Sequence, residues 1–296
     1  MKKLLIPVLL LLGISSVKAQ DTLYVTDTAI YAAKTNKVYV SYSADGEVKR
    51  PSPYTVRYKR DIPINIGLIG LNYLGVTLVN NKKDITPAEA MALKKENVPF
   101  FDRGNVGYFD ESIDKASYTP FYASFAWPVV MMFVDGDQTR HLGQVVTMYI
   151  QTMAVTGAMF SITAGLVNRP RPLVYGANTP MDRRTSNNSQ RSFFAGHTAA
   201  TAASSFFTAK VFSDMNPDSK LKPVVWVVAA GLPALVGYQR YKSGQHFLSD
   251  NILGYAIGAA TGILIPKWHK TAASKNMSIM PAFGPNYQGM AMVYKF

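Results

Sequence analysis

The chain of 296 residues has no cysteine, only four histidines and comparatively few charged residues. Without cysteine, neither a disulfide framework nor thiol chemistry is possible. Charged residues make up 17% of the sequence, below the usual quarter, whereas 48% are hydrophobic. Acidic residues are scarcer than basic ones, 18 against 31, which leaves a net charge of +13. This balance favours one helical domain in contact with a membrane.

The positive charge does not indicate nucleic-acid binding. The basic residues gather between apolar segments, in residues 49–60, 169–191 and 267–275, with no RNP-type, zinc-finger or helix-turn-helix signature among them. An anionic lipid surface or a phosphorylated substrate fits such clusters better. We therefore expect a membrane and a phosphorylated molecule as partners, and no nucleic acid.

The first 19 residues are typical of a secretory signal peptide. Lys2 and Lys3 precede an apolar run from Leu4 to Ile14, and "VKA" at 17–19 ends in a small residue suited to cleavage. The run is shorter than the ~20 residues of a standard spanning helix. We expect mature protein to begin at Gln20; the alternative is an uncleaved anchor.

Two polar, β-prone segments flank the rest of the chain. Residues 20–60 contain "TLYVTD" and "KVYVSYS" with a turn-like "ADGE", and residues 269–296 end in "MAMVYKF". They leave residues 61–268 as the main domain.

Six long segments of the main domain are nearly free of charge, and each approaches the ~20 residues that cross a bilayer. They are residues 62–81, 116–134, 142–168, 192–209, 223–239 and 251–266. Several contain polar residues and many small ones, which permit close helix packing. The pattern predicts an all-α, six-helix bundle in or on a membrane; a soluble bundle is the alternative.

The sequence "NRPRP" at 168–172 follows the third of these segments. Its two prolines stop the helix and stiffen the exit, so Arg171 is held in a restricted loop. A guanidinium offers a planar fork of donors that matches phosphate oxygens. Taken alone, such a loop is also typical of a cytoplasmic loop of a membrane protein.

The stretch "SFFAGHTAA" at 192–200 places a histidine at an expected helix start. Small Ala195 and Gly196 let backbone N–H groups approach an anion at the first helical turn. His197 then stands beside the bound group, where an imidazole can protonate a leaving alkoxide. A simple polar cap is the alternative for this histidine.

The stretch "YQRYKSGQHFLSDNILGY" at 238–255 carries a second histidine. His246 and Asp250 are four residues apart, so on a helix they share one face, and the carboxylate can accept the Nδ1 proton. That arrangement frees Nε2 as a nucleophile. Arg240, six residues before His246, is a plausible second clamp for the same anion.

Together the three pieces, Arg-Pro, Gly-His-Thr and Arg-x5-His-x3-Asp, resemble the type 2 phosphatidic acid phosphatase (PAP2) family. That family shares its fold with bacterial nonspecific acid phosphatases and vanadium haloperoxidases. The resemblance covers roughly residues 60–268. It implies that His246 is a nucleophile forming a phosphohistidine, that Asp250 orients it, and that His197 is the general acid. It further implies phosphate ligands from Arg171, Arg240 and the Gly196 backbone, with no metal and no cofactor.

Two positions depart from the family pattern. Ala164 stands where the family usually has a lysine, and Ala195 where it usually has a serine. Arg169, Arg191 or Lys242 are candidates to replace the missing positive charge.

The resemblance implies an envelope phosphatase acting on phosphomonoesters or pyrophosphates, with isoprenoid pyrophosphates, phosphatidic acid, phosphatidylglycerol phosphate or lipid A phosphates as candidate substrates. The alternatives are an inactive relative that binds anionic head groups, a soluble periplasmic acid phosphatase, and, more remotely, a transporter. We expect a bacterial envelope protein, membrane-associated, with its site facing the periplasm. A cleaved signal peptide followed by six crossings would instead place the site in the cytoplasm. The sequence gives no oligomeric state.

Overall fold

The computed structural model describes residues 41–42, 48–49, 52–270, 277–284 and 287–294. The predicted signal peptide, the strand expected at "TLYVTD" and the turn at "ADGE" lie outside these residues. Residues up to Arg50 form one unit and residues from Pro51 a second. In the first unit, strands β1 (Ser41–Tyr42) and β2 (Val48–Lys49) pair antiparallel.

Six long helices of the second unit correspond to the six predicted segments. They are α1 (Tyr58–Asn80), α4 (Tyr118–Val134), α6 (Leu142–Leu166), α8 (Gly196–Met215), α9 (Lys222–Lys242) and α10 (Leu248–His269). The predicted all-α bundle is therefore confirmed. The largest difference is in α8, which begins four residues later than predicted and runs to Met215, because Ser192–Ala195 form a non-helical entry with Ala195 in an extended conformation.

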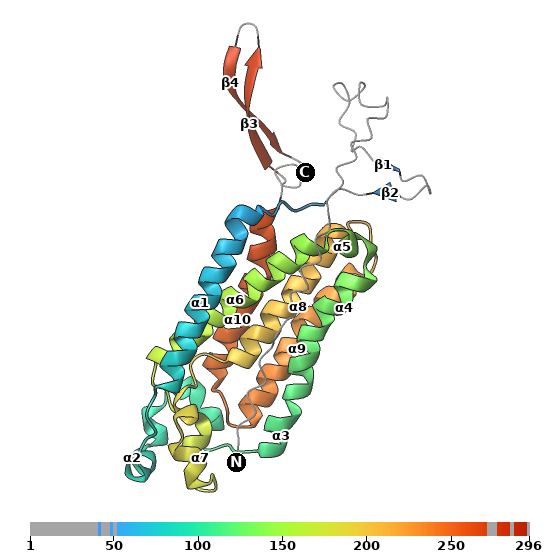
Figure 1. The fold of residues 1–296 in the computed structure, drawn as a ribbon. Helices are drawn as coiled ribbons and strands as arrows, with labels where there is room; N and C mark the ends of the chain where they lie inside the picture. Colours follow the sequence, from blue (N-terminus) through green and yellow to red (C-terminus); the bar gives the residue numbers. More distant parts are fainter. Residues whose placement is uncertain (1–40, 43–47, 50–51, 271–276, 285–286, 295–296) are drawn as a thin grey trace, which may run out of the picture. The chain divides into compact units, whose positions relative to one another are not determined.

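The connections at one end of the bundle contain short helices, which the sequence did not predict. Figure 1 shows α2, α3 and α7 gathered at the end where α1 and α6 finish, with α5 at the opposite end. The short elements are α2 (Pro87–Ala92), η2 (Lys95–Asn97), η3 (Phe100–Asn105), α3 (Glu111–Ala116), α5 (Gly136–Arg140), η4 (Pro172–Tyr175), α7 (Met181–Thr185) and η5 (Asn187–Gln190). Side-chain caps begin several of them, including a capping box formed by Thr86 and Glu89 on α2.

Helix α8 is the central element, packed against α4, α6, α9 and α10, while α1 lies on α6. Its closest neighbour is α10, which presents Gly254, Gly258 and Gly262 at every fourth position. A Cβ on Gly258 would run into the carbonyl oxygen of Ala199 and lie 2.8 Å from the Cβ of Ala202. Glycine is therefore what allows the two backbones to approach so closely.

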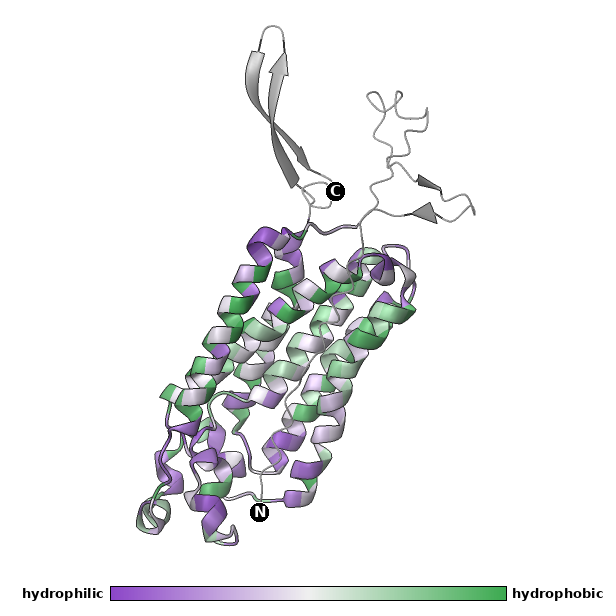
Figure 2. Cartoon of the chain, viewed as in Figure 1, coloured by the Kyte–Doolittle hydropathy of each residue, from purple (hydrophilic) through white to green (hydrophobic). Residues whose placement is uncertain are grey.

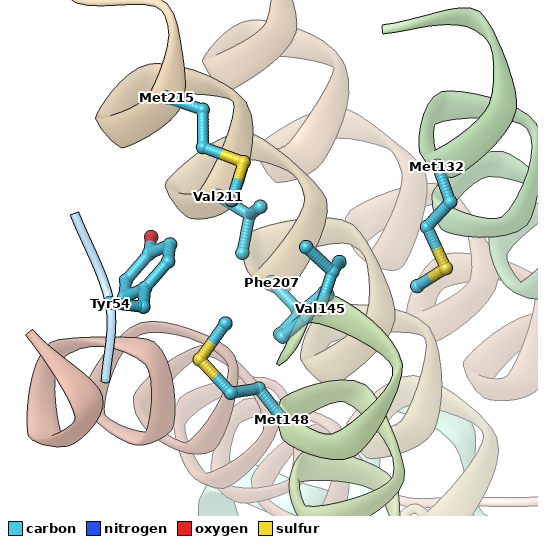
Figure 3. Packing of buried hydrophobic residues seen from close by; sticks show 7 residues of the cluster. All are labelled: Tyr54, Met132, Val145, Met148, Phe207, Val211 and Met215. Atoms are coloured by element: carbon cyan, nitrogen blue, oxygen red, sulfur yellow. The ribbon is translucent and has the colours of Figure 1, made fainter. Parts of the chain in front are cut away.

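A buried hydrophobic cluster closes the end of the bundle away from α2, α3 and α7. Figure 3 shows side chains from α6 and α8 beside Tyr54, which lies just before α1, with Met132 of α4 at the other side of the cluster. The cluster comprises Tyr54, Met132, Val145, Met148, Phe207, Val211 and Met215. Tyr54 also forms a β-bridge with Lys270, so the chain enters α1 and leaves α10 at the same end.

The outer faces of several helices are apolar. Figure 2 shows hydrophobic residues along the long helices and hydrophilic ones gathered towards their ends. In the described part of the chain, α1, α6 and α10 are long and apolar enough to cross a membrane. These helices agree with the expected membrane association.

The C-terminal β-prone segment contains a hairpin. Strands β3 (Met277–Gly284) and β4 (Tyr287–Tyr294) pair antiparallel, with Met277 opposite Tyr294 and Gly284 opposite Tyr287. The β-prone pattern of this tail is thus confirmed.

Candidate phosphate-binding site

The candidate site residues come together where α9 ends and where α8 and α10 begin. Arg171 lies in the loop after α6, His197 in the first turn of α8, and Arg240 in the last turn of α9. His246 and Asp250 come from the approach to α10 and its first turn. Because consecutive long helices run in opposite directions, these stretches, far apart in sequence, meet at one end of the bundle.

His246 is held in one tautomer. Its side chain is 1% exposed, and its Nδ1 lies 2.6 Å from the backbone carbonyl oxygen of Ser192. A carbonyl oxygen only accepts, so Nδ1 must carry the proton and Nε2 the lone pair. Within the described residues, Nε2 has no hydrogen-bond partner in the protein. The ring therefore presents a nucleophilic nitrogen to the site.

Asp250 supports His246 through Ser192, whereas the sequence predicted a direct contact. The Asp250 carboxylate accepts hydrogen bonds from the Ser192 hydroxyl at 2.6 Å and from the Phe247 backbone N–H at 3.0 Å, and it pairs with Arg169. These bonds join the entry to α8 to the start of α10. The spacing of His246 and Asp250 cannot reveal this arrangement. The acceptor for Nδ1 of His246 is the carbonyl of Ser192, which belongs to another segment of the chain.

The two predicted arginines are buried and braced by polar partners. Arg171 is 7% exposed and donates to the Gln245 side chain. Arg240 is 2% exposed, pairs with Asp114 and donates to the Ser117 hydroxyl at 3.1 Å. Each retains a buried Nε–H that lacks a partner in the described residues. Both guanidinium groups thus have fixed positions and donor capacity left for an anion.

Arg240 also stacks in an aromatic setting. Its guanidinium carbon lies 5.5 Å from the centre of the Tyr118 ring. The Tyr118 ring meets the His197 ring edge-on, with 5.3 Å between the ring centroids. The centroid of the Phe121 ring lies 4.5 Å from that of His197. These aromatic rings fix the position of His197 relative to Arg240.

His197 is held in the opposite tautomer to His246. Its Nδ1 lies 3.3 Å from a terminal nitrogen of Arg240, which can only donate. Nδ1 is therefore the acceptor, and Nε2 carries the proton. One histidine of the site thus offers a lone pair and the other an N–H donor.

Gly196 gives close access to the first turn of α8. A Cβ at this position would lie 2.6 Å from the Phe160 ring, so a larger residue would displace the ring or the turn. The first backbone N–H groups of a helix have no intrahelical acceptor and attract anions. Of the neighbouring amides, Ala195 is already bound to the Asp250 carbonyl oxygen at 3.0 Å. The next two backbone N–H groups, those of Gly196 and His197, are therefore the donors expected for a phosphate.

The three cations proposed to replace the missing lysine have different surroundings. Ala164 itself is fully buried in α6. Arg169 pairs with both Asp102 and Asp250, and Lys242 lies over the Tyr108 ring at 5.4 Å. Arg191 donates its Nε–H to the Asn188 side chain at 2.7 Å, and no carboxylate among the described residues pairs with it.

Burial, and then the nearby positive charges, lower the pKa values of Arg171, His246 and His197 in the site. Burial, followed by repulsion from Arg240 and Arg191, lowers the pKa of Arg171 to about 9, which still leaves it charged at neutral pH. Burial and then Arg171 and Arg240 lower the pKa of His246 well below 6.5. Burial and the three arginines do the same for the pKa of His197. An anion entering the site would relieve this repulsion.

Several residues of the site escaped the sequence prediction. Asp102 and Asp114 come from the polar connection between α1 and α4, which carries no recognisable motif. Tyr118, Ser192 and Gln245 were likewise not predicted. Ser192 and Gln245 lie inside quoted motifs, but their partners come from other segments. Among the described residues, no group of three or more His, Cys, Asp or Glu could hold a metal ion.

Residues 145–274 match the model of the PAP2 superfamily. The matched residues include most of α6 and all of α8, α9 and α10, and therefore every residue predicted for the site.

Two solved structures are similar to the chain. One is LpxE of Aquifex aeolicus, with 21% identity over 58% of this chain and 98% of that one, and a TM-score of 0.40. The other is a transmembrane PAP2-type phosphatidylglycerolphosphate phosphatase of Bacillus subtilis, with 16% identity over 72% of this chain and 96% of that one, and a TM-score of 0.41. No curated protein matches the chain.

Proposed function

We propose that this protein is a membrane phosphatase that removes a terminal phosphate from a phosphorylated lipid through a phosphohistidine on His246. The observation that carries the proposal is the tautomer of His246: its Nδ1–H is bound to the Ser192 carbonyl, and the buried ring lies in the electrostatic field of Arg171 and Arg240. A neutral imidazole in such a field is a nucleophile placed where a phosphate would bind.

In the first step, Nε2 of His246 attacks phosphorus. The N–P bond forms while the bond from phosphorus to the leaving oxygen breaks. The leaving oxygen takes its proton from Nε2 of His197, whose ring becomes protonated when the substrate anion binds. Arg171, Arg240 and the first turn of α8 stabilise the negative charge on the phosphoryl oxygens. The proton on Nδ1 lets the Ser192 carbonyl stabilise the positive charge that develops on the ring.

In the second step, water attacks the phosphohistidine. An O–P bond forms, the N–P bond breaks, inorganic phosphate leaves and His246 returns to its starting tautomer. Division into two steps replaces one difficult hydrolysis by two easier ones. Asp250 and Arg169 act as positioning residues, since they hold Ser192 and the start of α10 in place.

A lipid is the proposed substrate class because the site lies at the end of a bundle whose helices α1, α6 and α10 are apolar enough to enter a membrane. Phosphatidic acid, phosphatidylglycerol phosphate and isoprenoid pyrophosphates are the candidates to compare. The bacterial envelope, with the site facing the periplasm, is the proposed location.

The test is release of inorganic phosphate from these lipids by purified protein in detergent, with a metal chelator present. We expect release that persists with the chelator and falls to background in His246→Ala. His141→Ala, outside the site at the end of α5, is the matched control and should keep its activity. No release from any candidate lipid, together with unchanged vesicle binding by His246→Ala, would instead identify an inactive binder of anionic lipids.

A further inference from the structure

A cavity lined by several charged residues lies near the segment that carries Gln190 and Arg191. It measures about 630 Å³ and is bounded by the end of α1, the connection to α2, the end of α6 and Gln190. Its charged lining residues are Lys82, Lys83, Asp84 and Glu89, and none of them belongs to the set of catalytic and phosphate-binding residues. The mechanism above gives this cavity no role.

Gln190 is a buried donor without a partner. The residue lines the cavity and is 5% exposed, and its side-chain Nε2 has no hydrogen-bond partner among the described residues. A buried amide nitrogen left unpaired costs free energy unless a ligand or water accepts its hydrogens. Its position therefore indicates a ligand with acceptor oxygens.

Lys82 lies beside the backbone of Gln190 and has no carboxylate partner in the described part of the chain. Its Nζ donates to the Val167 carbonyl oxygen at 2.6 Å and lies 3.4 Å from that of Gln190. Burial and the positive charge of Arg191 lower the pKa of Lys82. An anion bound beside Lys82 and Arg191 would relieve their mutual repulsion.

The two carboxylates of the cavity are already engaged by the backbone. Asp84 accepts from the Asn187 N–H at 2.6 Å. Glu89 accepts from the N–H and hydroxyl of Thr86, at 2.7 Å and 2.8 Å, as part of the α2 capping box. Their engagement with the loop leaves the donors of Lys82 and Gln190 as the groups available to a ligand.

The cavity and the candidate site share two segments. Gln190 directly precedes Arg191, and its carbonyl oxygen accepts from the Arg169 N–H at 3.0 Å. Arg191 also acts electrostatically on Arg171 and His197 on the catalytic side. Arg191 therefore acts electrostatically both on Lys82 at the cavity and on the residues of the candidate site.

We propose that Lys82 and Gln190 form a second anion-binding site, which takes a second phosphate group of the lipid substrate while the terminal phosphate meets His246. The inference rests on the proposed function and narrows its substrate class to lipids with two phosphate groups. Such a site would favour phosphatidylglycerol phosphate over phosphatidic acid with the same acyl chains.

The experiment compares kcat/KM for these two lipids and for nitrophenyl phosphate in the wild type, Lys82→Ala and Gln190→Leu. We expect each change to lower kcat/KM for phosphatidylglycerol phosphate about tenfold, and to alter the two single-phosphate substrates less than about twofold. Lys95→Ala, which removes a lysine elsewhere in the same connecting region, should behave as wild type.

Gln190→Leu separates this role from a structural one. Because it removes an unpaired buried donor, it should keep or raise the thermal unfolding midpoint while it loses the preference for the second phosphate. Equal losses on all three substrates, or no loss on any, would overturn the inference. Non-competitive inhibition of phosphatidic acid hydrolysis by inorganic phosphate, abolished in Gln190→Leu, would show a site for free phosphate and would also overturn it.

These outcomes are distinct from a failure of the proposed function. Absence of wild-type hydrolysis of every substrate would contradict the phosphatase itself. Hydrolysis of all three without the predicted discrimination would contradict the second site alone.

Discussion

Two histidines with opposite tautomers give the site its chemical asymmetry. The Ser192 carbonyl fixes the proton of His246 on Nδ1, and the Arg240 guanidinium fixes that of His197 on Nε2. One ring can then attack phosphorus while the other donates a hydrogen bond. Neither assignment follows from the order of the motifs alone, because each depends on a partner from a different segment.

The lowered pKa of His246 predicts activity that extends into acid. Protonation of His246 removes the nucleophile, so kcat/KM should fall on the acid side only below pH 6.5, the ordinary histidine value. Arg171→Gln removes a positive charge that lowers this pKa. The acid limb of the pH profile should therefore move to higher pH in this variant, whatever its maximal rate.

The pH profiles of the wild type and of Arg171→Gln are compared with the same substrate. Because the substrate titrates identically in both, a difference between the profiles reports the enzyme's own group. An acid limb that stays at the same pH in Arg171→Gln would contradict the electrostatic assignment.

His197 donates from Nε2, but its lowered pKa leaves it neutral until an anion enters. If bound substrate raises the pKa and the ring protonates the leaving oxygen, His197→Ala should impair poor alkoxide leaving groups most. We expect an additional loss on the order of 10²–10⁴-fold for an alkyl phosphate compared with nitrophenyl phosphate, measured as the rate of phosphoenzyme formation. Equal losses for both substrates, together with weaker vanadate binding, would make His197 a phosphate ligand only.

At the scale of elements, the interface of α8 and α10 sets the distance between His197 and His246. The apolar runs of the sequence predicted all six long helices. Its many small residues predicted that these helices pack closely. It could not predict the start of α8, because the entry at Ser192–Ala195 is fixed by bonds to Asp250 from α10. The short helices η3 and α3 were missed for the same reason, since Asp102, Asn105 and Asp114 bind partners far along the chain.

Gly258 tests this interface. In Gly258→Ala the new Cβ would meet the Ala199 backbone, so the helices must separate. We expect a loss of about 1–3 kcal/mol in the free energy of unfolding, seen as a lower thermal midpoint, and reduced kcat. Gly231→Ala in α9 is the matched control, since a Cβ there meets nothing within 4 Å. It should be neutral or stabilising by up to about 1 kcal/mol, and equal behaviour of the two variants would contradict the packing argument.

At the scale of the whole molecule, the flanks of the bundle constrain its orientation. Tyr54 and Lys270 pair at the end opposite to the candidate site. If all six long helices cross a membrane, these flanks and the site face opposite sides. The flanks and the site can therefore both face the periplasm only if some of the six helices do not cross the membrane. In the described residues, three helices have the length and hydropathy needed to cross.

A membrane-impermeant phosphate ester tests the proposed orientation. Spheroplasts carrying the protein should hydrolyse it externally if the site faces the periplasm, while His246→Ala spheroplasts should not. Activity that emerges only after lysis would place the site in the cytoplasm and contradict the proposal.

The proposed intermediate is a covalent phosphate on Nε2 of His246. Because phosphohistidine is acid-labile, loss of the label in acid distinguishes it from phosphate on residues that form acid-stable bonds. The most direct measurement is a rapid quench of protein with a ³²P-labelled substrate, followed by peptide mapping under alkaline conditions. We expect label on the peptide that contains His246, lost on acid treatment, absent from His246→Ala and retained in His141→Ala. Hydrolysis by the wild type without any label on His246 under these conditions would contradict the account.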